Sequence, residues 1–222
     1  MVPFHFLGTQ IFCLKLMGKK KQSSRGYSKR KQNTRQIRKR FLIICEGKET
    51  EPNYFRSFRV PGKVEVLVKG YGRDPNQLLI EAKKLLEKEK QAKKWQKGDQ
   101  VWCVFDRDSW KEKEFNKAII DTKEEGFNVA YSNEAFELWY ILHFEYLNTP
   151  IPRKEYCKKL SKLLGHEYEK NSVNMYDKLF NKIETAIKHA EKLYAQYNHR
   201  NPAKENPSTT VYQLVKELKK NE

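Results

Sequence analysis

Short apolar runs alternate with amphipathic segments through the first two thirds of the chain. The runs predict strands, because they are rich in β-branched and aromatic residues: FLIIC (41–45), KVEVLVKG (63–70), QVWCVFDRD (100–108) and FNVAYS (127–132). The segments between them have the apolar spacing of helices, at 52–58, 75–95, 112–125 and 134–147. Pro52 is expected to be the first residue of its helix and Asn133 to cap the last one. This alternation predicts an α/β fold with a largely parallel sheet flanked by helices.

The last third of the chain predicts helices alone. An apolar stripe repeats every three or four residues between 176 and 197, and TTVYQLVKELKK (209–220) has the pattern of a closing helix. We therefore expect three parts: a basic tail over 1–37, an α/β domain over 38–150, and a helical C-terminal region over 151–222 that packs on this domain.

The formal net charge of +17 is unevenly distributed. The first 40 residues contain twelve lysines and arginines and no acidic residue. Such a tail suits the phosphate backbone of a nucleic acid. The expected contacts are Lys29, Arg30, Lys31, Arg35, Arg38, Lys39 and Arg40. The alternative is a solvated tail that only aids solubility.

We expect the beginning of the chain to be neither an export signal nor a membrane span. The first 17 residues are apolar, but they lack the basic segment and cleavage site of a signal peptide and are too short to cross a bilayer. We expect Met17 to be the true start and residues 1–16 to be an artefact of start-site assignment. Four widely spaced cysteines without a CxxC motif indicate reduced thiols. A cytoplasmic protein without membrane contact is the resulting expectation.

Three acids lie at the carboxyl ends of predicted strands. Glu46 follows the first strand, and Asp106 and Asp108 end the third. Ligands of parallel sheets bind at the carboxyl ends of the strands, and residues i and i+2 of an extended chain point the same way. Carboxylates brought together repel unless a cation lies between them, and oxygen ligands favour Mg²⁺ or Mn²⁺ over zinc. The alternative is that these acids only cap neighbouring helices.

Three further residues are candidates for the site, each with a structural alternative. Glu137 interrupts a very apolar helix, where a buried carboxylate is costly, but it could also be an acid at a helix start. His143 could be a general acid or a packed core histidine. Lys48 could contact a phosphate after Glu46 or be an ordinary exposed lysine.

Four sequence blocks resemble a known family. Glu-Gly after one strand and Asp-x-Asp after a later one resemble the Toprim pattern of topoisomerases, primases and OLD-type nucleases. More closely, the chain from about residue 38 to its C-terminus is similar to the RloB family of bacterial phage-defence and abortive-infection proteins. The blocks are ICEGKETEPNYF, VFDRDSW, YSNEAFELWYILHFE and NPSTTVYQLV. Two positions depart from the expected pattern, NEAFE in place of NPCFE and KET in place of a threonine pair, and neither removes a predicted ligand.

The resemblance implies a Toprim-like, Mg²⁺- or Mn²⁺-dependent nuclease that works with an ABC- or OLD-type ATPase encoded nearby. Glu46 would then be the general base or a metal-associated acid, and Asp106 and Asp108 would be metal ligands. Glu137 would be a further acidic residue of the site. DNA and RNA, including tRNA, remain open as substrates.

Two other classes of function compete with this interpretation. A binding module would recognise nucleic acid or a partner ATPase without cleavage, and its acids would be structural. A sugar-nucleotide transferase also uses Asp-x-Asp, but the sequence has no supporting nucleotide loop.

Overall fold

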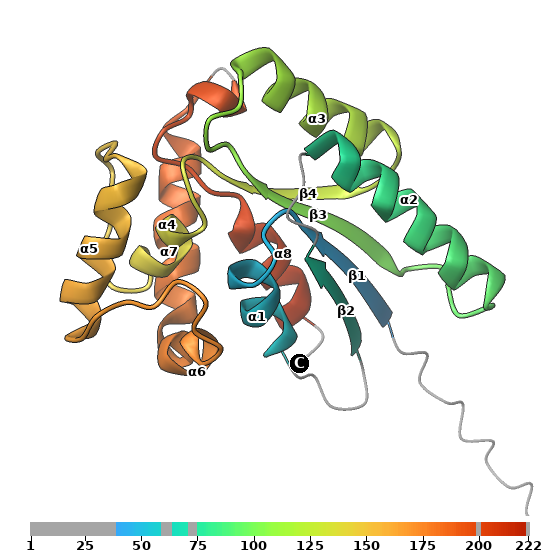
Figure 1. The fold of residues 1–222 in the computed structure, drawn as a ribbon, viewed down its shortest axis with the longest axis horizontal. Coiled ribbons are helices and arrows are strands. Elements are labelled where there is room, and N and C mark those ends of the chain that lie inside the picture. The colour runs from blue at the N-terminus through green and yellow to red at the C-terminus, as the bar shows by residue number, and fades with distance from the viewer. Residues whose placement is uncertain (1–38, 59–63, 71–74, 199–200, 221–222) are drawn as a thin grey trace, which may run out of the picture. The chain divides into compact units, whose positions relative to one another are not determined.

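Four parallel strands form one sheet in the order β2-β1-β3-β4 (Figure 1). The computed structural model describes residues 39–58, 64–70, 75–198 and 201–220. The strands are β1 (Lys39–Cys45), β2 (Val64–Gly70), β3 (Gln100–Asp106) and β4 (Asn128–Ser132). The predicted α/β class with a parallel sheet is therefore confirmed, and the architecture is Rossmann-like. The predicted tail over 1–37 lies outside the described residues.

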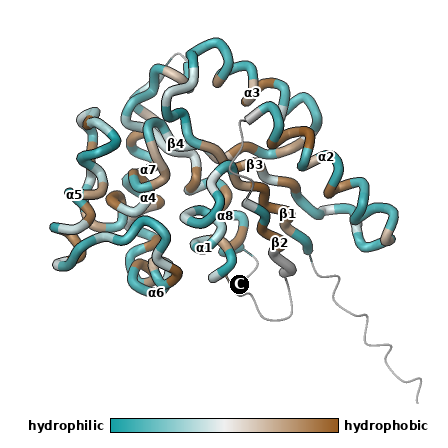
Figure 2. The backbone as a smooth tube through the Cα atoms, in the orientation of Figure 1, coloured by the Kyte–Doolittle hydropathy of each residue, from teal (hydrophilic) through white to brown (hydrophobic). Residues whose placement is uncertain are grey.

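Two helices cover one face of the sheet, α2 (Pro75–Gln91) and α3 (Glu112–Glu124). Side chains alternate between the faces of a strand, so Leu42 and Ile44 of β1 pack with these helices. Phe41, Ile43 and Cys45 face the opposite side. Both faces are covered, which explains why β1 contains a continuous apolar run and why the central strands carry brown, hydrophobic stretches in Figure 2.

The other face packs on the remaining helices in one continuous hydrophobic core. These elements are α1 (Thr50–Arg56), α4 (Glu137–Ile141), α5 (Arg153–Leu164), α6 (Met175–Leu179), α7 (Ile183–Ala195) and α8 (Val211–Lys219). Two short 3₁₀ turns lie between them, η1 (Phe180–Lys182) before α7 and η2 (Pro202–Lys204) before α8, and Ala203 of η2 is part of the core on the α2–α3 side. The prediction of helices alone after residue 153 agrees with these elements. Among the described residues, no helix has the length and hydropathy that crossing a membrane requires.

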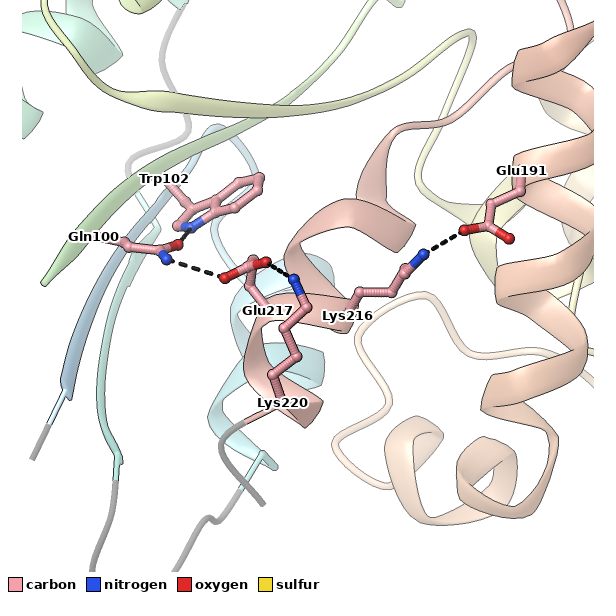
Figure 3. A network of polar contacts seen from close by, with 6 residues as sticks. All are labelled: Gln100, Trp102, Glu191, Lys216, Glu217 and Lys220. Carbon is pink, nitrogen blue, oxygen red and sulfur yellow. Dashed lines mark hydrogen bonds and ion pairs between the residues drawn. The ribbon is translucent and has the colours of Figure 1, made fainter. Parts of the chain in front are cut away.

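A polar network fixes the closing helix α8 to the sheet and to α7 (Figure 3). Gln100 at the start of β3 donates from Nε2 to Oε2 of Glu217 at 3.1 Å. Lys216 forms an ion pair of 2.6 Å with Glu191 of α7. The predicted inward residues of α8 are buried, so the helix is held by an apolar face and a polar end.

The helix predicted over 134–147 is much shorter than expected. The helical residues run only from Glu137 to Ile141, because the chain enters through Glu134 in the left-handed region, at φ +69°. Asn133 does not cap this helix, since its side-chain amide donates to the carbonyl of Pro202 at 2.8 Å. The predicted burial of this helix is confirmed, since all residues of α4 are buried. Apolar residues on all sides of a helix indicate burial, but they provide no periodic pattern from which its length could be predicted.

Candidate functional site

The carboxyl ends of β1 and β3 bring Glu46 and Asp106 together. The backbone N–H of Glu46, directly after β1, donates to the carbonyl of Val104 in the neighbouring strand at 2.8 Å. The side-chain Oε2 of Glu46 accepts the backbone N–H of Asp106 at 3.1 Å. Two of the predicted site residues thus lie side by side at the edge where α/β sheets bind ligands.

Asp106 has a buried carboxylate with one unsatisfied oxygen. The residue is 8% exposed, and its Oδ2 accepts the backbone N–H of Phe136 at 3.0 Å. Its Oδ1 is buried and has no hydrogen-bond partner among the described residues. Burial raises the pKa of Asp106 well above its ordinary value, and the charges of Glu51, Glu137 and Glu46 raise it further. A cation would stabilise a carboxylate in this environment.

Glu51, which was not predicted from the sequence, is a further acid of this site. It lies in the first turn of α1, which begins two residues before the expected Pro52 start. Its carboxylate lies so close to Gly47 that an added Cβ there would be 2.0 Å from Oε2. Burial is the main cause that raises the pKa of Glu51. The signal was a further acid five residues after Glu46, but acids in a first helical turn usually only complement the helix dipole.

Glu137, at the start of α4, completes the acidic group. It is 3% exposed, and its Oε1 accepts the hydroxyl of Tyr168 at 3.4 Å. Burial is the main cause that raises the pKa values of Asp106 and Glu51, and the negative charge of Glu137 raises both further. The structure therefore brings Glu137 together with the acids of the sheet edge, while its functional role stays a prediction.

The acids face a pocket of about 340 Å³ at the carboxyl edge of the sheet. Its lining includes Glu51, Asp106 and Glu137 together with the predicted Lys48, which is exposed. Glu46 lies beside this lining through its hydrogen bond to Asp106. Two predicted acids, Asp106 and Glu137, therefore line one cavity with two acids that were not predicted, Glu49 and Glu51, and Glu46 lies beside them.

Asp108 lies outside β3 and outside the pocket lining, contrary to the expected alternation. The strand predicted over 100–108 ends at Asp106, and Asp108 has a φ of +39°, so the chain is not extended there. Asp108 has a side chain that is 47% exposed and forms an ion pair with Arg153 of α5. Its charge still acts on the site: burial is the main cause that raises the pKa of Glu46 to about 7, and Asp108 contributes.

His143 lies in the hydrophobic core and is not part of the pocket lining. It is 1% exposed, and its Nδ1–H donates to the carbonyl of Trp139 at 2.8 Å. Its ring lies edge-on to the Trp139 ring, with 4.9 Å between the centroids. Burial lowers the pKa of His143 to about 4. The structure thus agrees with the alternative of a packed core histidine and does not bring this residue to the acids.

The described part of the predicted nucleic-acid contact set lies at the other end of β1. Lys39 and Arg40 begin this strand, roughly 20 Å from Glu46 at the usual rise per residue. Arg40 forms an ion pair of 2.7 Å with Glu89, and its side chain is largely buried. The other expected contacts, Lys29, Arg30, Lys31, Arg35 and Arg38, lie outside the described residues.

The residues of the pocket fit a hard divalent cation. Among the described residues, no three His, Cys, Asp or Glu side chains already stand in a metal-binding arrangement. Mg²⁺, however, is commonly held by one or two carboxylates together with waters and substrate phosphates. The orphaned Oδ1 of Asp106 and an all-carboxylate donor set meet that requirement.

A parallel sheet with buried carboxylates at its carboxyl edge defines a Rossmann-like α/β protein with an acidic site. The family model described as RloB-like protein matches residues 41–218, and the chain belongs to this RloB-like family. The match includes all four acids of the site. A search of curated proteins found no match, and neither did a search of solved structures.

Proposed function

We propose that this protein is a Mg²⁺-dependent, Toprim-like nuclease that cleaves phosphodiester bonds in DNA or RNA. The observation that carries the proposal is the buried Oδ1 of Asp106, which has no hydrogen-bond donor within the described ranges and is surrounded by other carboxylates. Such an arrangement costs stability unless a cation is bound. Family membership supports the proposal, because the matched region contains these acids.

The pocket residues have distinct roles in this proposal. Asp106, Glu51 and Glu137 would hold Mg²⁺ or Mn²⁺, while Asp108, which is paired with Arg153, would only add negative charge beside them. The bound ion supplies charge stabilisation at a phosphoryl oxygen and lowers the pKa of water. Glu46, which is hydrogen-bonded to the backbone of Asp106, would accept the proton of the attacking water. Lys48 would contact a phosphate at the mouth of the pocket.

The proposal extends to the setting in which the enzyme acts. Its basic tail would hold nucleic acid by sequence-independent phosphate contacts. Its activity would serve anti-phage defence or abortive infection in the cytoplasm, together with an ABC- or OLD-type ATPase encoded nearby. These points are supported by the charge of the first 40 residues and by membership of the RloB-like family.

A binding module is the second candidate. The observation that favours it is the absence, within the described ranges, of three ligands already arranged for a metal ion. In that case the raised pKa values of Glu46, Glu51 and Asp106 would favour protonated, structural carboxyl groups, and the chain would bind nucleic acid or an ATPase without cleavage.

A nuclease assay distinguishes the two candidates. Plasmid, single-stranded DNA and tRNA are incubated with Mg²⁺ or Mn²⁺, and wild-type protein is compared with Glu46→Ala and with an EDTA control. The nuclease proposal predicts cleavage that both controls abolish. If nothing is cut with or without the product of the neighbouring ATPase gene, the binding module is the better account.

A further inference from the structure

Three cationic side chains lie among the acids of the pocket. They come from distant segments: the loop after β1, the start of α5 and the loop between α5 and α6. The lining contains four acidic and three basic residues, so its formal charge is −1; these are Glu49, Glu51, Asp106, Glu137, Lys48, Arg153 and Lys170. A divalent cation would change this charge to +1. The loaded pocket would then attract an anion.

The backbones that carry two of these cations are fixed by local packing. Oγ1 of Thr50 in α1 donates to the carbonyl of Lys170 at 2.9 Å, which ties that loop to the pocket. Gly70 at the end of β2 lies against the loop after β1, since an added Cβ would be 2.7 Å from the carbonyl oxygen of Lys48. These lysines therefore start from defined positions at the pocket.

Arg153 is the cation best placed to recognise a planar anion. It is the first residue of α5, its side chain is 36% exposed, and it lines the pocket. Its Nη1 forms the ion pair with Asp108, which orients the guanidinium. A guanidinium has five N–H donors in a fixed plane, so one ion pair leaves donors for a second anion. Two parallel N–H donors match two phosphate oxygens.

We propose that Arg153, supported by Lys48 and Lys170, binds the substrate phosphate, and that Asp108 holds the guanidinium in position for it. This inference rests on the proposed function, because it assumes a phosphodiester substrate at the acidic pocket. The ligand class is a nucleotide phosphate. The competing account is that Arg153 only neutralises the neighbouring carboxylates.

The test measures nucleotide binding without cleavage. Thymidine 5′-monophosphate is titrated calorimetrically in Ca²⁺ into wild type, Arg153→Ala and Arg153→Lys. The control is Lys154→Ala, the next residue of α5, which is exposed and not part of the lining. We expect Arg153→Ala to weaken binding about tenfold or more, because a charge-assisted hydrogen bond is removed, with partial recovery in Arg153→Lys. Thermal unfolding checks that all variants are folded.

Two outcomes overturn the phosphate site: a wild type that does not bind the nucleotide, and an Arg153→Ala protein that binds it as Lys154→Ala does. The nuclease proposal is judged separately by metal-dependent cleavage of plasmid, single-stranded DNA and tRNA. If Arg153 is needed for nucleotide binding but no metal-dependent cleavage occurs, the phosphate site stands and the nuclease proposal fails. If the wild type cleaves one of these substrates but Arg153→Ala binds the nucleotide normally, the nuclease proposal stands and the phosphate site fails.

Discussion

At the scale of one residue, Asp106 shows how a buried acid opposes stability. Its carboxylate is buried, one oxygen has no donor within the described part of the chain, and three other acids raise its pKa. Near neutral pH, the metal-free protein must either keep a proton there or bury a negative charge. Both cost free energy relative to an uncharged side chain of the same shape.

The substitution Asp106→Asn tests this conflict. Asparagine keeps an oxygen for the backbone N–H of Phe136 and removes the charge. We expect the free energy of unfolding in EDTA at pH 8 to rise by about 1–2 kcal/mol. Asp121→Asn, on α3 in a surface pair with Lys117, is the control and should change it by under about 0.5 kcal/mol. Urea unfolding measures both, and a less stable Asp106→Asn protein would contradict the account.

His143 should give the protein an acid-sensitive stability. Its pKa falls from 6.5 to about 4 on folding because burial disfavours the charged ring. The unfolded chain therefore binds a proton below pH 6.5 while the folded protein does not. Stability from this group is complete above pH 6.5 and is lost as the pH falls toward 4, by up to about 3 kcal/mol.

Urea unfolding between about pH 4.5 and 7.5, the window in which the unfolded histidine titrates, checks this prediction. His143→Phe should remove the part of the acid loss that is due to this residue, so its stability should decline less than that of wild type over this range. His166→Phe, which replaces an exposed histidine, should follow wild type. Parallel curves for wild type and His143→Phe would contradict a buried neutral imidazole.

At the scale of elements, the loop after β1 depends on two close glycines. An added Cβ at Gly70 would lie 2.5 Å from the carbonyl oxygen of Gly47 and 2.7 Å from that of Lys48. These are backbone atoms of the loop that joins Glu46 to α1. Contact with the end of β2 therefore fixes the position of this loop at the sheet edge. The position of the loop in turn determines where the Glu51 carboxylate lies.

Gly70→Ala should damage both stability and the site. We expect a loss of about 1–3 kcal/mol, because overpacking against backbone cannot be relieved by a side-chain rotation. Under the proposed nuclease function, cleavage of the nucleic-acid substrate should also fall as the loop is displaced. The control is Gly98→Ala, at φ +100° with no atom near its added Cβ, which should cost about 1 kcal/mol and leave activity unchanged. Equal activity of the two variants would show that Gly70 does not position the site.

The strands and most helices could be predicted because their apolar periods are regular. Each predicted strand agrees with β1–β4 to within about two residues, and Glu46 follows β1 as expected. The contribution of Glu51 could not be read from the sequence, since it depends on how the loop at Gly47 folds back. Arg153 was hidden for another reason: it comes from α5, after the last strand, and reaches the pocket only through tertiary packing. The pairing of Asp106 with Asp108 failed because the chain leaves the extended conformation after β3.

At the scale of the whole molecule, the acidic pocket and the start of β1 lie at opposite ends of the sheet. Residues 1–37, which precede β1, contain nine lysines and arginines and no acid. Phosphate contacts by such a segment would add up along a long nucleic acid, whereas a mononucleotide offers only one phosphate group. Removal of this segment should therefore weaken the binding of long nucleic acids and leave the affinity for a mononucleotide unchanged.

Deletion of residues 1–37 tests this separation. We expect weaker binding of a labelled single strand of about 30 nucleotides and a shallower salt dependence, by roughly 0.7 in log–log slope for each phosphate that the tail no longer neutralises. Affinity for thymidine 5′-monophosphate should not change. Deletion of residues 1–16, which removes only Lys15 among the basic residues, is the control. Fluorescence anisotropy from about 50 to 300 mM KCl, a range over which salt increasingly screens exposed charges, gives the slopes. Identical slopes for the two deletions would contradict the role of the tail.

The most direct test of the central claim is a titration of Mg²⁺ and Mn²⁺ followed by the free energy of unfolding. If the carboxylates around Asp106 hold a divalent cation, a hundredfold excess over Kd should stabilise the wild type by about 2.7 kcal/mol. Asp106→Asn should lose this gain, although it is expected to be the more stable protein in EDTA. A wild type that neither ion stabilises would contradict the metal site and the nuclease mechanism built on it.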